Sequence, residues 1–453
     1  MVMTPFSLIT SRTGPHRSSP RRIVIHRGLD LAVDGAPVLS IDPAKRVGRV
    51  ALLGGDFPGI RPSFLVREGD RVRRGDPLFV DRSDPRIRVT TPIAGRVVAI
   101  VRGERRMFRW IEIQEEGEGE RSFPAVDPEE IPSLPRERVR ETLLDSGLWT
   151  SLRSRPFGSV PSPDHTPAAL FVTVTDTSPL AVDPRIVVAH SPDLFRAGVT
   201  VLRRLLDGPL FLCVPPGFTE DVKGVETVEF AGPHPAGLAG THIHFLMPVD
   251  QERTVWQIPY QEVIAIGSLF TLGRIDGERT IGIGGPGLHH PRLFRLPVGS
   301  DLREIVDGEL RDGPYRVISG SILSGHRLED APFLGRFHTL VSVMPEHRDR
   351  PLLGWLKGVF GRYPLRSPRS TSLHGSPRAI VPIGVYDRVN PLRIEMVWLL
   401  RSLLADDREG ALELGCLELL EEDLSLLSYV CPSKIDYGFH LRRMLERIAK
   451  EGL

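Results

Sequence analysis

The chain has 453 residues, of which 41% are hydrophobic and 25% charged, so it is long and apolar enough to build about three globular domains. Its formal net charge of +1 excludes nucleic acid as the main partner, and three cysteines are too few for a disulfide framework. No apolar run approaches the ~18–20 residues that cross a bilayer, so we expect no direct membrane span.

Residues 1–22 are rich in Ser, Pro and Arg and are predicted to be a disordered extension. Tight turns and alternating apolar residues then dominate residues 23–120. Gly-Asp pairs begin at Gly69 and Gly75, and a third turn is expected at Gly95, each glycine supplying a positive φ. This pattern is similar to the barrel-sandwich hybrid fold of biotinyl and lipoyl carrier domains. A carrier presents a lysine between its two halves, whereas residues 81–88 contain none.

Residues 121–278 change to a pattern of apolar strands alternating with amphipathic helices, which predicts a Rossmann-like α/β domain with parallel strands. The strand after which a nucleotide loop would stand continues as Thr175, Asp176 and Thr177, without a glycine loop. We expect these elements: helices at Pro135–Ser146, Asp193–Leu206 and Gln261–Thr271, and strands at Ala169–Thr175, Pro209–Val214 and Val225–Phe230.

Three further segments complete the predicted organisation. Residues 279–345 are rich in short β-type runs and indicate a small β module of the SLBB or β-grasp type, and residues 346–378 are predicted to be a loop or linker. Residues 379–453 indicate a C-terminal helical domain, with one helix opening at Asn390 and a last helix at Tyr437–Lys450. The expected fold class is therefore multidomain α+β.

Two motifs match the residue pattern of a cofactor site but lack the neighbouring residues that such a site needs. Gly282–Gly287 matches G-x-G-x-x-G, but Pro291 and Pro297 deny the helix that must follow, so a turn is expected. Cys416 and Cys431 cannot complete an iron–sulfur cluster or a zinc site and are interpreted as buried structural thiols. We expect no metal and no cofactor bound by this chain.

The most suggestive polar side chains are His242 and His244, placed on one face of a predicted strand at 241–245. Such histidines could bind a metal or donate hydrogen bonds to a quinone carbonyl, although packing histidines are the commoner case. Trp256 and Tyr260 add aromatic surface nearby. These four residues are the candidate quinone-binding residues, and no catalytic residue is assigned.

Taken together, the chain resembles the NqrA family, whose members are components of the sodium-translocating NADH:quinone reductase, the Nqr complex. The resemblance runs in order from about residue 23 to the C-terminus and is specific only as a set. Its stretches are His26–Asp30, Val50–Gly54, Arg61–Pro62, Ser146–Thr150, Arg155–Phe157, Phe171–Asp176, Phe230–Gly237, Gly240–Phe245, Val255–Trp256, Tyr260–Gly267, Arg316–Ser321, Gly335–His338, Val381–Gly384, Leu414–Leu419 and Val430–Pro432.

The resemblance implies a peripheral protein at the cytoplasmic face of the bacterial inner membrane. It implies partners among the other Nqr proteins, NqrB to NqrF, above all the integral membrane protein NqrB. That complex oxidises NADH, uses FMN, riboflavin, FAD and iron–sulfur centres on those partners, reduces ubiquinone and exports sodium, which makes it a translocase. Residues 151–157 stand where related Rnf and complex I electron-entry proteins have a glycine-rich loop.

Three functions follow as alternatives. The chain could contribute to the quinone site, or it could be a pure assembly scaffold that descends from an electron-entry protein and binds no quinone. The third alternative, an electron-entry enzyme with its own FMN, is opposed by the missing glycine loop and cysteines.

Overall fold

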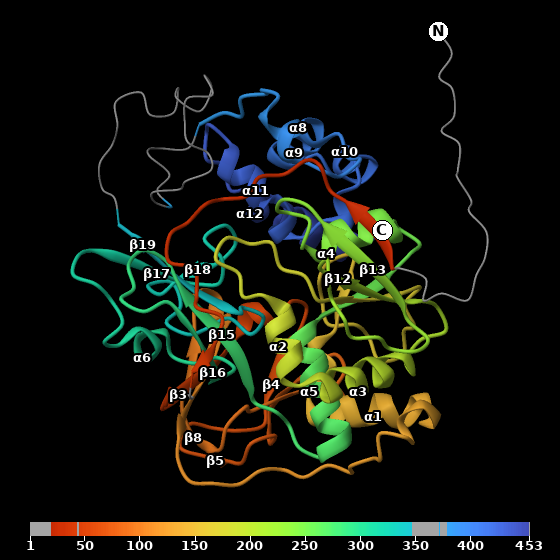
Figure 1. Cartoon of the computed structure of the whole chain (residues 1–453), viewed down its shortest axis with the longest axis vertical. Coiled ribbons are helices and arrows are strands. Elements are labelled where there is room, and N and C mark those ends of the chain that lie inside the picture. The colour runs from red at the N-terminus through yellow and green to blue at the C-terminus, as the bar shows by residue number, and fades with distance from the viewer. Residues whose placement is uncertain (1–19, 43–44, 347–370, 372–377, 453) are drawn as a thin grey trace.

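The computed structural model describes residues 20–42, 45–346, 371 and 378–452. In Figure 1 the C-terminal helices cap one end of the molecule, and strands β5 and β8 of the barrel-sandwich module lie toward the other end, level with helices α1 and α5. The predicted extension at 1–22 and the predicted loop at 346–378 fall mostly outside the described residues. Arg21 and Arg22 are described and belong to a strand rather than to a disordered extension.

The N-terminal module is a pair of small antiparallel sheets, with orders β3-β9-β8-β5 and β4-β6-β7. Alternation along the strands buries Val50, Val97 and Ile111 between them. Its strands are β3 (Arg49–Leu53), β4 (Pro62–Phe64), β5 (Arg71–Val72), β6 (Pro77–Asp81), β7 (Arg88–Thr90), β8 (Gly95–Arg102) and β9 (Phe108–Glu115).

Glycine is required in this module for two different reasons: a positive φ in a turn, or close approach of a neighbouring strand. Gly69 and Gly75 have φ of +94° and +86°, as predicted for Gly-Asp turns. The prediction for Gly95 is wrong, because it opens strand β8 and is not among the residues with positive φ. A Cβ at Gly95 would lie 2.1 Å from the carbonyl oxygen of Gln114, so close strand approach is what requires glycine there.

The second module is a six-stranded sheet of order β1-β13-β12-β11-β14-β10, parallel except for β10. The central strands β11 and β12 are apolar except for Thr173, because helices cover them. The strands are β1 (Arg21–Val24), β10 (Arg153–Arg155), β11 (Leu170–Thr173), β12 (Leu210–Val214), β13 (Glu226–Ala231) and β14 (Val255–Pro259). The helices are α1 (Arg136–Ser146), α2 (Pro184–His190), α3 (Pro192–Arg203), α4 (Ala239–Leu246) and α5 (Tyr260–Leu272).

Helices α3 and α5 of this module cross at unusually short range. A Cβ at Gly198 would lie 2.0 Å from the carbonyl oxygen of Val263, and one at Gly267 would lie 1.8 Å from that of Leu194. Only glycine allows the two backbones to approach so closely. This crossing fixes α5, and with it the position at which the chain enters the third module.

The third module is a six-stranded sheet of order β18-β17-β19-β15-β16-β2. Gly282 and Gly284 lie in a strand, and the expected turn begins at Gly285 with φ of +121°. Its elements are β2 (Ile41–Asp42), β15 (Glu278–Gly284), β16 (Arg292–Pro297), α6 (Leu302–Val306), β17 (Tyr315–Ser319), β18 (His326–Arg327) and β19 (Leu340–Pro345).

The C-terminal module is helical, with α8 (Val385–Val389), α9 (Met396–Ala405), α10 (Arg408–Glu413), α11 (Glu421–Val430) and α12 (Tyr437–Glu451). The helix predicted to open at Asn390 begins instead at Met396. The Asn390 amide donates to the carbonyl oxygens of Leu392 and Ile394, both at 3.1 Å, and so stabilises a non-helical turn. Within the described part of the chain no helix is long and apolar enough to cross a membrane.

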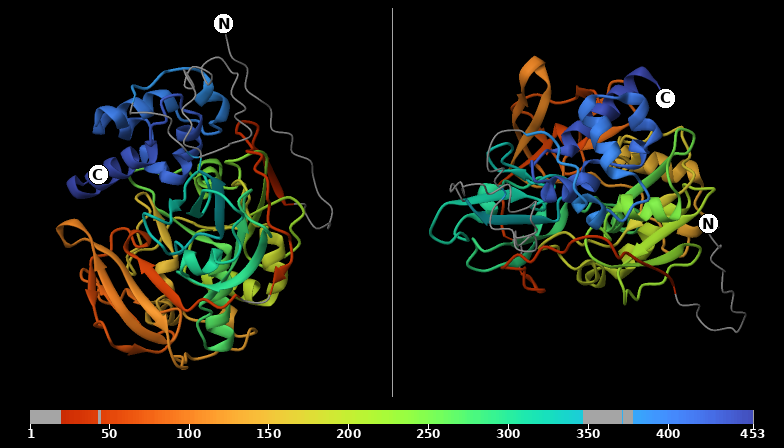
Figure 2. Two further views of the ribbon diagram at one scale, coloured as in Figure 1. Left: turned by 90° about the vertical axis from the view of Figure 1, so that its left-hand side faces the viewer. Right: turned by 90° about the horizontal axis from the view of Figure 1, so that it is seen from above.

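The N-terminal segment ties the modules together before the first module begins. Strand β1 pairs in parallel with β13 of the second module, and β2 pairs in parallel with β16 of the third. Figure 2 shows this first segment running along the outside of both sheets. Residues 23–24, which the sequence assigns to the barrel-sandwich domain, therefore pair with the α/β sheet.

Candidate functional site

The two candidate histidines lie on helix α4, not on a strand. Residues two apart on a helix project about 200° from each other, so His242 and His244 cannot share a face. The prediction of a strand at 241–245 is therefore wrong. Local alternation of apolar residues is compatible with either element in so short a run, and the tertiary packing of α4 decides between them.

His242 is fully buried and acts as a local clamp. Its Nε2 lies 3.0 Å from the carbonyl oxygen of Ala236 and 3.2 Å from the Thr175 hydroxyl, and its ring packs 4.2 Å from that of Phe230. Its Nδ1 has no hydrogen-bond partner among the described residues. Burial lowers the pKa of His242 to about 3, so the ring is neutral at physiological pH.

His244 connects the second module to the C-terminal helices. Its Nε2 accepts a hydrogen bond of 2.9 Å from the backbone N–H of Arg393, so its Nδ1 carries the proton and donates to the Glu418 carboxylate at 2.7 Å. Both ring nitrogens are thereby used within the chain. This geometry gives His244 a docking role between modules.

Trp256 of β14 and Tyr260 of α5 are part of the hydrophobic core of the second module. The ring of Trp256 packs edge-on against Trp149 at 5.4 Å, and burial raises the pKa of the Tyr260 phenol. The structure therefore does not bring the four candidates together: His242 and His244 lie on different sides of α4, and Trp256 and Tyr260 lie in the core. None of the four lines the cavity described below. Their role as quinone ligands stays a prediction.

The loop after β13 covers the carboxyl end of β11, where open α/β sheets commonly bind ligands. The Thr177 hydroxyl accepts from the backbone N–H of Gly237 at 2.9 Å and lies 3.2 Å from Nδ1 of His234. The Thr175 hydroxyl donates to the Gly237 carbonyl oxygen at 3.1 Å. The chain itself thus fills the place where a glycine loop would hold a phosphate, in line with the missing nucleotide motif.

A buried ion network joins the first three modules. Glu262 of α5 pairs with Arg279 of β15 at 2.7 Å and with Arg336 at 3.5 Å, and it accepts a hydrogen bond from the Ser151 hydroxyl. The backbone N–H of Arg336 donates to Asp56 of the barrel-sandwich module at 3.0 Å. Burial raises the pKa of Asp56, while the two arginines outweigh burial and lower that of Glu262.

A second buried ion network holds the C-terminal module. The Arg155 side chain is 0% exposed and donates to the Asp423 carboxylate at 2.7 Å, to the Glu418 carbonyl oxygen at 2.8 Å and to Gln257 at 3.0 Å. Arg155, on strand β10, therefore docks the C-terminal module on the second module.

The cysteines behave as the sequence predicts. Cys213, Cys416 and Cys431 are free and buried. The Cys431 sulfur lies 3.2 Å from the Tyr386 hydroxyl and 3.4 Å from that of Tyr437, and burial raises the pKa of Cys416 to about 12. No group of three or more His, Cys, Asp or Glu residues in the described ranges could hold a metal ion.

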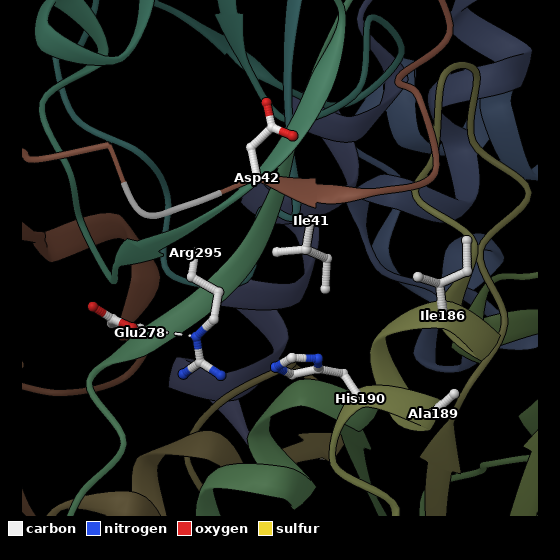
Figure 3. A pocket seen from close by; sticks show the side chains of 7 residues that line it. All are labelled: Ile41, Asp42, Ile186, Ala189, His190, Glu278 and Arg295. Carbon is white, nitrogen blue, oxygen red and sulfur yellow. Dashed lines mark hydrogen bonds and ion pairs between the residues drawn. The ribbon is translucent and has the colours of Figure 1, made fainter.

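A cavity that is widely open to solvent, with a volume of about 780 Å³, lies between helix α2 and the sheet of the third module. Figure 3 shows Ile41 pointing from β2 into this space and the His190 ring pointing toward the Arg295 guanidinium. Ile186 and Ala189 of α2 form the apolar wall on the other side.

Carboxylates hold the polar side of the cavity. Arg295 Nη2 donates to both oxygens of Asp276, at 3.0 and 3.1 Å, and its Nε donates to Glu278 at 3.2 Å. The Arg295 Nη1 group and the His190 ring have no hydrogen-bond partner among the described residues. Two N–H-bearing side chains therefore face an apolar-walled space.

Comparisons with known proteins agree over most of the chain. Three family models match: the NqrA N-terminal barrel-sandwich hybrid domain at residues 23–116, the NqrA second alpha/beta domain at 134–275 and the NQRA C-terminal domain, of SLBB type, at 280–330. The NqrA component of the Na(+)-translocating NADH-quinone reductase of Photorhabdus laumondii is 44% identical over 95% of this chain and 100% of its own length. Those of Serratia proteamaculans and Klebsiella pneumoniae are each 46% identical over the same shares.

The chain belongs to the NqrA family of the Na⁺-translocating NADH-quinone reductase. The resemblance drawn from the sequence motifs and the expected fold class are thereby confirmed. Two solved structures of an NAD⁺-reducing [NiFe]-hydrogenase are also similar, at 14% and 13% identity. They cover 72% and 73% of this NqrA-family chain and 63% and 68% of their own chains, with TM-scores of 0.37 and 0.38.

Sequence reasoning about this NqrA-family chain missed the cavity residues. His190 and Arg295 come from different modules, and no motif joins them. His190 stands at the carboxyl end of the short helix α2, for which the sequence predicts no element. The same limit applies to Arg336 and Glu262, because an ion pair between modules leaves no spacing rule in a single sequence.

Proposed function

We propose that this chain is a peripheral component of a sodium-pumping NADH:ubiquinone oxidoreductase, at the cytoplasmic face of the bacterial inner membrane. It would dock on the integral membrane protein NqrB, among the partners NqrB to NqrF. Those partners would carry FMN, riboflavin, FAD and the iron–sulfur centres, and the membrane-embedded ones would export sodium. Supporting this proposal, the chain matches NqrA proteins over all of their length.

The same proposal gives the chain a share in quinone reduction through contact with the quinone. The observation that carries this step is a cavity in a protein whose own crevice at β11 is filled by the loop that ends at Gly237. A quinone needs an apolar surface for its ring and hydrogen-bond donors for its two carbonyl oxygens. The cavity offers both kinds of surface.

A ubiquinone titration of the purified full chain tests this contact. Tryptophan fluorescence would report binding, and a redox-inert hydrophobic compound of similar size would serve as the control. We expect saturable quenching that is selective for the quinone. Equal quenching by the control compound would contradict quinone contact by this chain on its own.

The second candidate function is a pure assembly scaffold descended from an electron-entry protein. Its supporting observation is the density of buried ion pairs between modules, including Arg155 with Asp423 and Glu262 with Arg279. Such pairs hold the modules in a fixed arrangement, as expected of a protein whose role is to bind other components of a complex. If the isolated chain binds no quinone and its deletion disrupts the complex, the scaffold role is favoured.

The four residues first singled out remain testable in the assembled complex. His242→Ala and His244→Ala would raise the quinone KM if these histidines contact the quinone. An unchanged quinone KM and kcat in both variants would remove them from the proposal. Because His244 also docks Glu418, complex assembly must be measured alongside.

A further inference from the structure

We infer that the cavity between α2 and the third module is the binding site for the quinone ring, with His190 and Arg295 as the two hydrogen-bond donors. Ile41, Ile186 and Ala189 would hold the ring between them. This inference rests on the proposed contact between the chain and a quinone. It assigns that contact to a place in the fold that the sequence did not indicate.

Both donor side chains have N–H groups without a hydrogen-bond partner among the described residues. Asp276 and Glu278 fix the Arg295 guanidinium through Nη2 and Nε, which leaves the two N–H groups of Nη1 without a partner within the described ranges, on a side chain that lines the cavity. His190 is exposed at the end of α2, and its ring makes no hydrogen bond to another described residue. An imidazole N–H and a guanidinium N–H can therefore each reach an acceptor oxygen.

The charges around the cavity select a neutral ligand. Arg295 faces two carboxylates, and Asp42 pairs with Arg292 at 3.4 Å, which also pairs with Glu309 at 2.6 Å. Of the charged residues that line the cavity, Asp42 and Glu278 are acidic and Arg295 is basic, so a carboxylate or phosphate ligand is disfavoured. A quinone carbonyl accepts hydrogen bonds without bringing a charge, and its ring matches the three apolar side chains.

The site joins two modules, which explains why the ring would be held there. Helix α2 supplies one wall, and strands β2, β15 and β16 supply the other. A ligand that contacts both walls adds contacts between the modules, and binding to the folded chain then stabilises their arrangement. Quinone should consequently raise the unfolding temperature of the chain.

Steric and polar variants of the full chain test the assignment with ubiquinone-1 as the probe. Ala189→Trp places an indole in the cavity mouth from an exposed position, and we expect it to abolish saturable binding. His190→Ala removes one donor and should raise the Kd about fivefold, the worth of one ordinary hydrogen bond. Circular dichroism and thermal unfolding would confirm that each variant is folded.

Matched controls exist elsewhere on the surface. Ala449→Trp adds a tryptophan at an exposed position of α12, and His165→Ala removes an exposed histidine from a loop. Both should bind ubiquinone-1 like the wild type. A neutral naphthoquinone should displace the probe, whereas naphthoate, which is similar in size but anionic, should not.

The outcomes separate this inference from the proposed function. If the wild type binds ubiquinone-1 and the Ala189→Trp and His190→Ala variants bind it equally well, quinone contact stands and the cavity assignment is overturned. If the wild type shows no selective binding, both the assignment and the proposed quinone contact of the isolated chain fail. Displacement by naphthoate as effective as by naphthoquinone would overturn the preference for a neutral ring.

Discussion

The second module meets its neighbours in two contrasting ways. At Arg155 and at Glu262 the interfaces are closed, and buried charges are paired at 2.7 Å. At the α2 cavity the interface with the third module stays open, with apolar walls and donors to spare. Paired charges hold the modules together at the closed interfaces. The space that remains at the α2 interface could accept a ligand.

The largest expected effect comes from breaking the closed interface. Arg155→Met leaves Asp423 buried without its cation, which should destabilise the fold by about 3–5 kcal/mol. Urea unfolding followed by circular dichroism would measure the loss. The matched control is Arg86→Met, which removes surface ion pairs with Asp84 and Asp164 and should shift the midpoint only slightly. Equal shifts in both variants would contradict the contrast.

Close packing within the second module should cost somewhat less to disturb. Gly267→Ala forces helices α3 and α5 apart, because its Cβ would collide with the Leu194 carbonyl oxygen. We expect destabilisation of about 1–3 kcal/mol, the usual cost of overpacking. In Gly384→Ala, where the added Cβ meets nothing within 4 Å, thermal unfolding should be nearly unchanged. A tolerant Gly267→Ala would show that the crossing can relax.

The pH dependence of the free energy of unfolding tests whether His242, beside the filled crevice, is neutral in the folded chain. Burial gives His242 a pKa of about 3, below the ordinary value near 6.5, so between these values the unfolded chain binds a proton that the folded chain does not. Stability is therefore full above about pH 6.5 and falls as pH decreases, by about 1.4 kcal/mol per pH unit for this residue. Urea unfolding from pH 7 to 5 should show a shallower slope for His242→Gln. Identical slopes would mean that the folded His242 takes up the proton.

The smallest effect on stability belongs to the open interface. Ala189→Trp fills space that is solvent-accessible in the folded chain, so its free energy of unfolding should lie within about 0.5 kcal/mol of the wild type. Differential scanning calorimetry would measure this. A large loss of stability would mean that the two walls of the cavity close on each other in solution.

The sequence predicted the parts of the fold that depend on local chemistry. Gly69 and Gly75 correctly predicted tight turns. The apolar run at 169–175 correctly predicted a parallel strand that is buried on both faces. Prediction failed where local signals were ambiguous or were overridden. Helix α4 alternates like a strand over five residues, and Asn390 uses its side chain to hold a turn where a helix start was expected.

The candidate site was less predictable than the fold for a physical reason. His242 and His244 are polar residues whose hydrogen bonds are made to the chain itself, and only the tertiary structure reveals those partners. The cavity residues have the opposite property. His190 and Arg295 look unremarkable in the sequence and become a pair only when α2 lies across from β16.

The pairing of β1 with β13 and of β2 with β16 has a consequence for biosynthesis. These first strands leave the ribosome early, but their partners near Ala231 and Pro297 are translated much later. The N-terminal segment must therefore wait as an unpaired chain while the barrel-sandwich module between them can already fold. Closure of the two larger sheets is a late, long-range event, so we expect maturation of this protein to be slow and sensitive to chaperones.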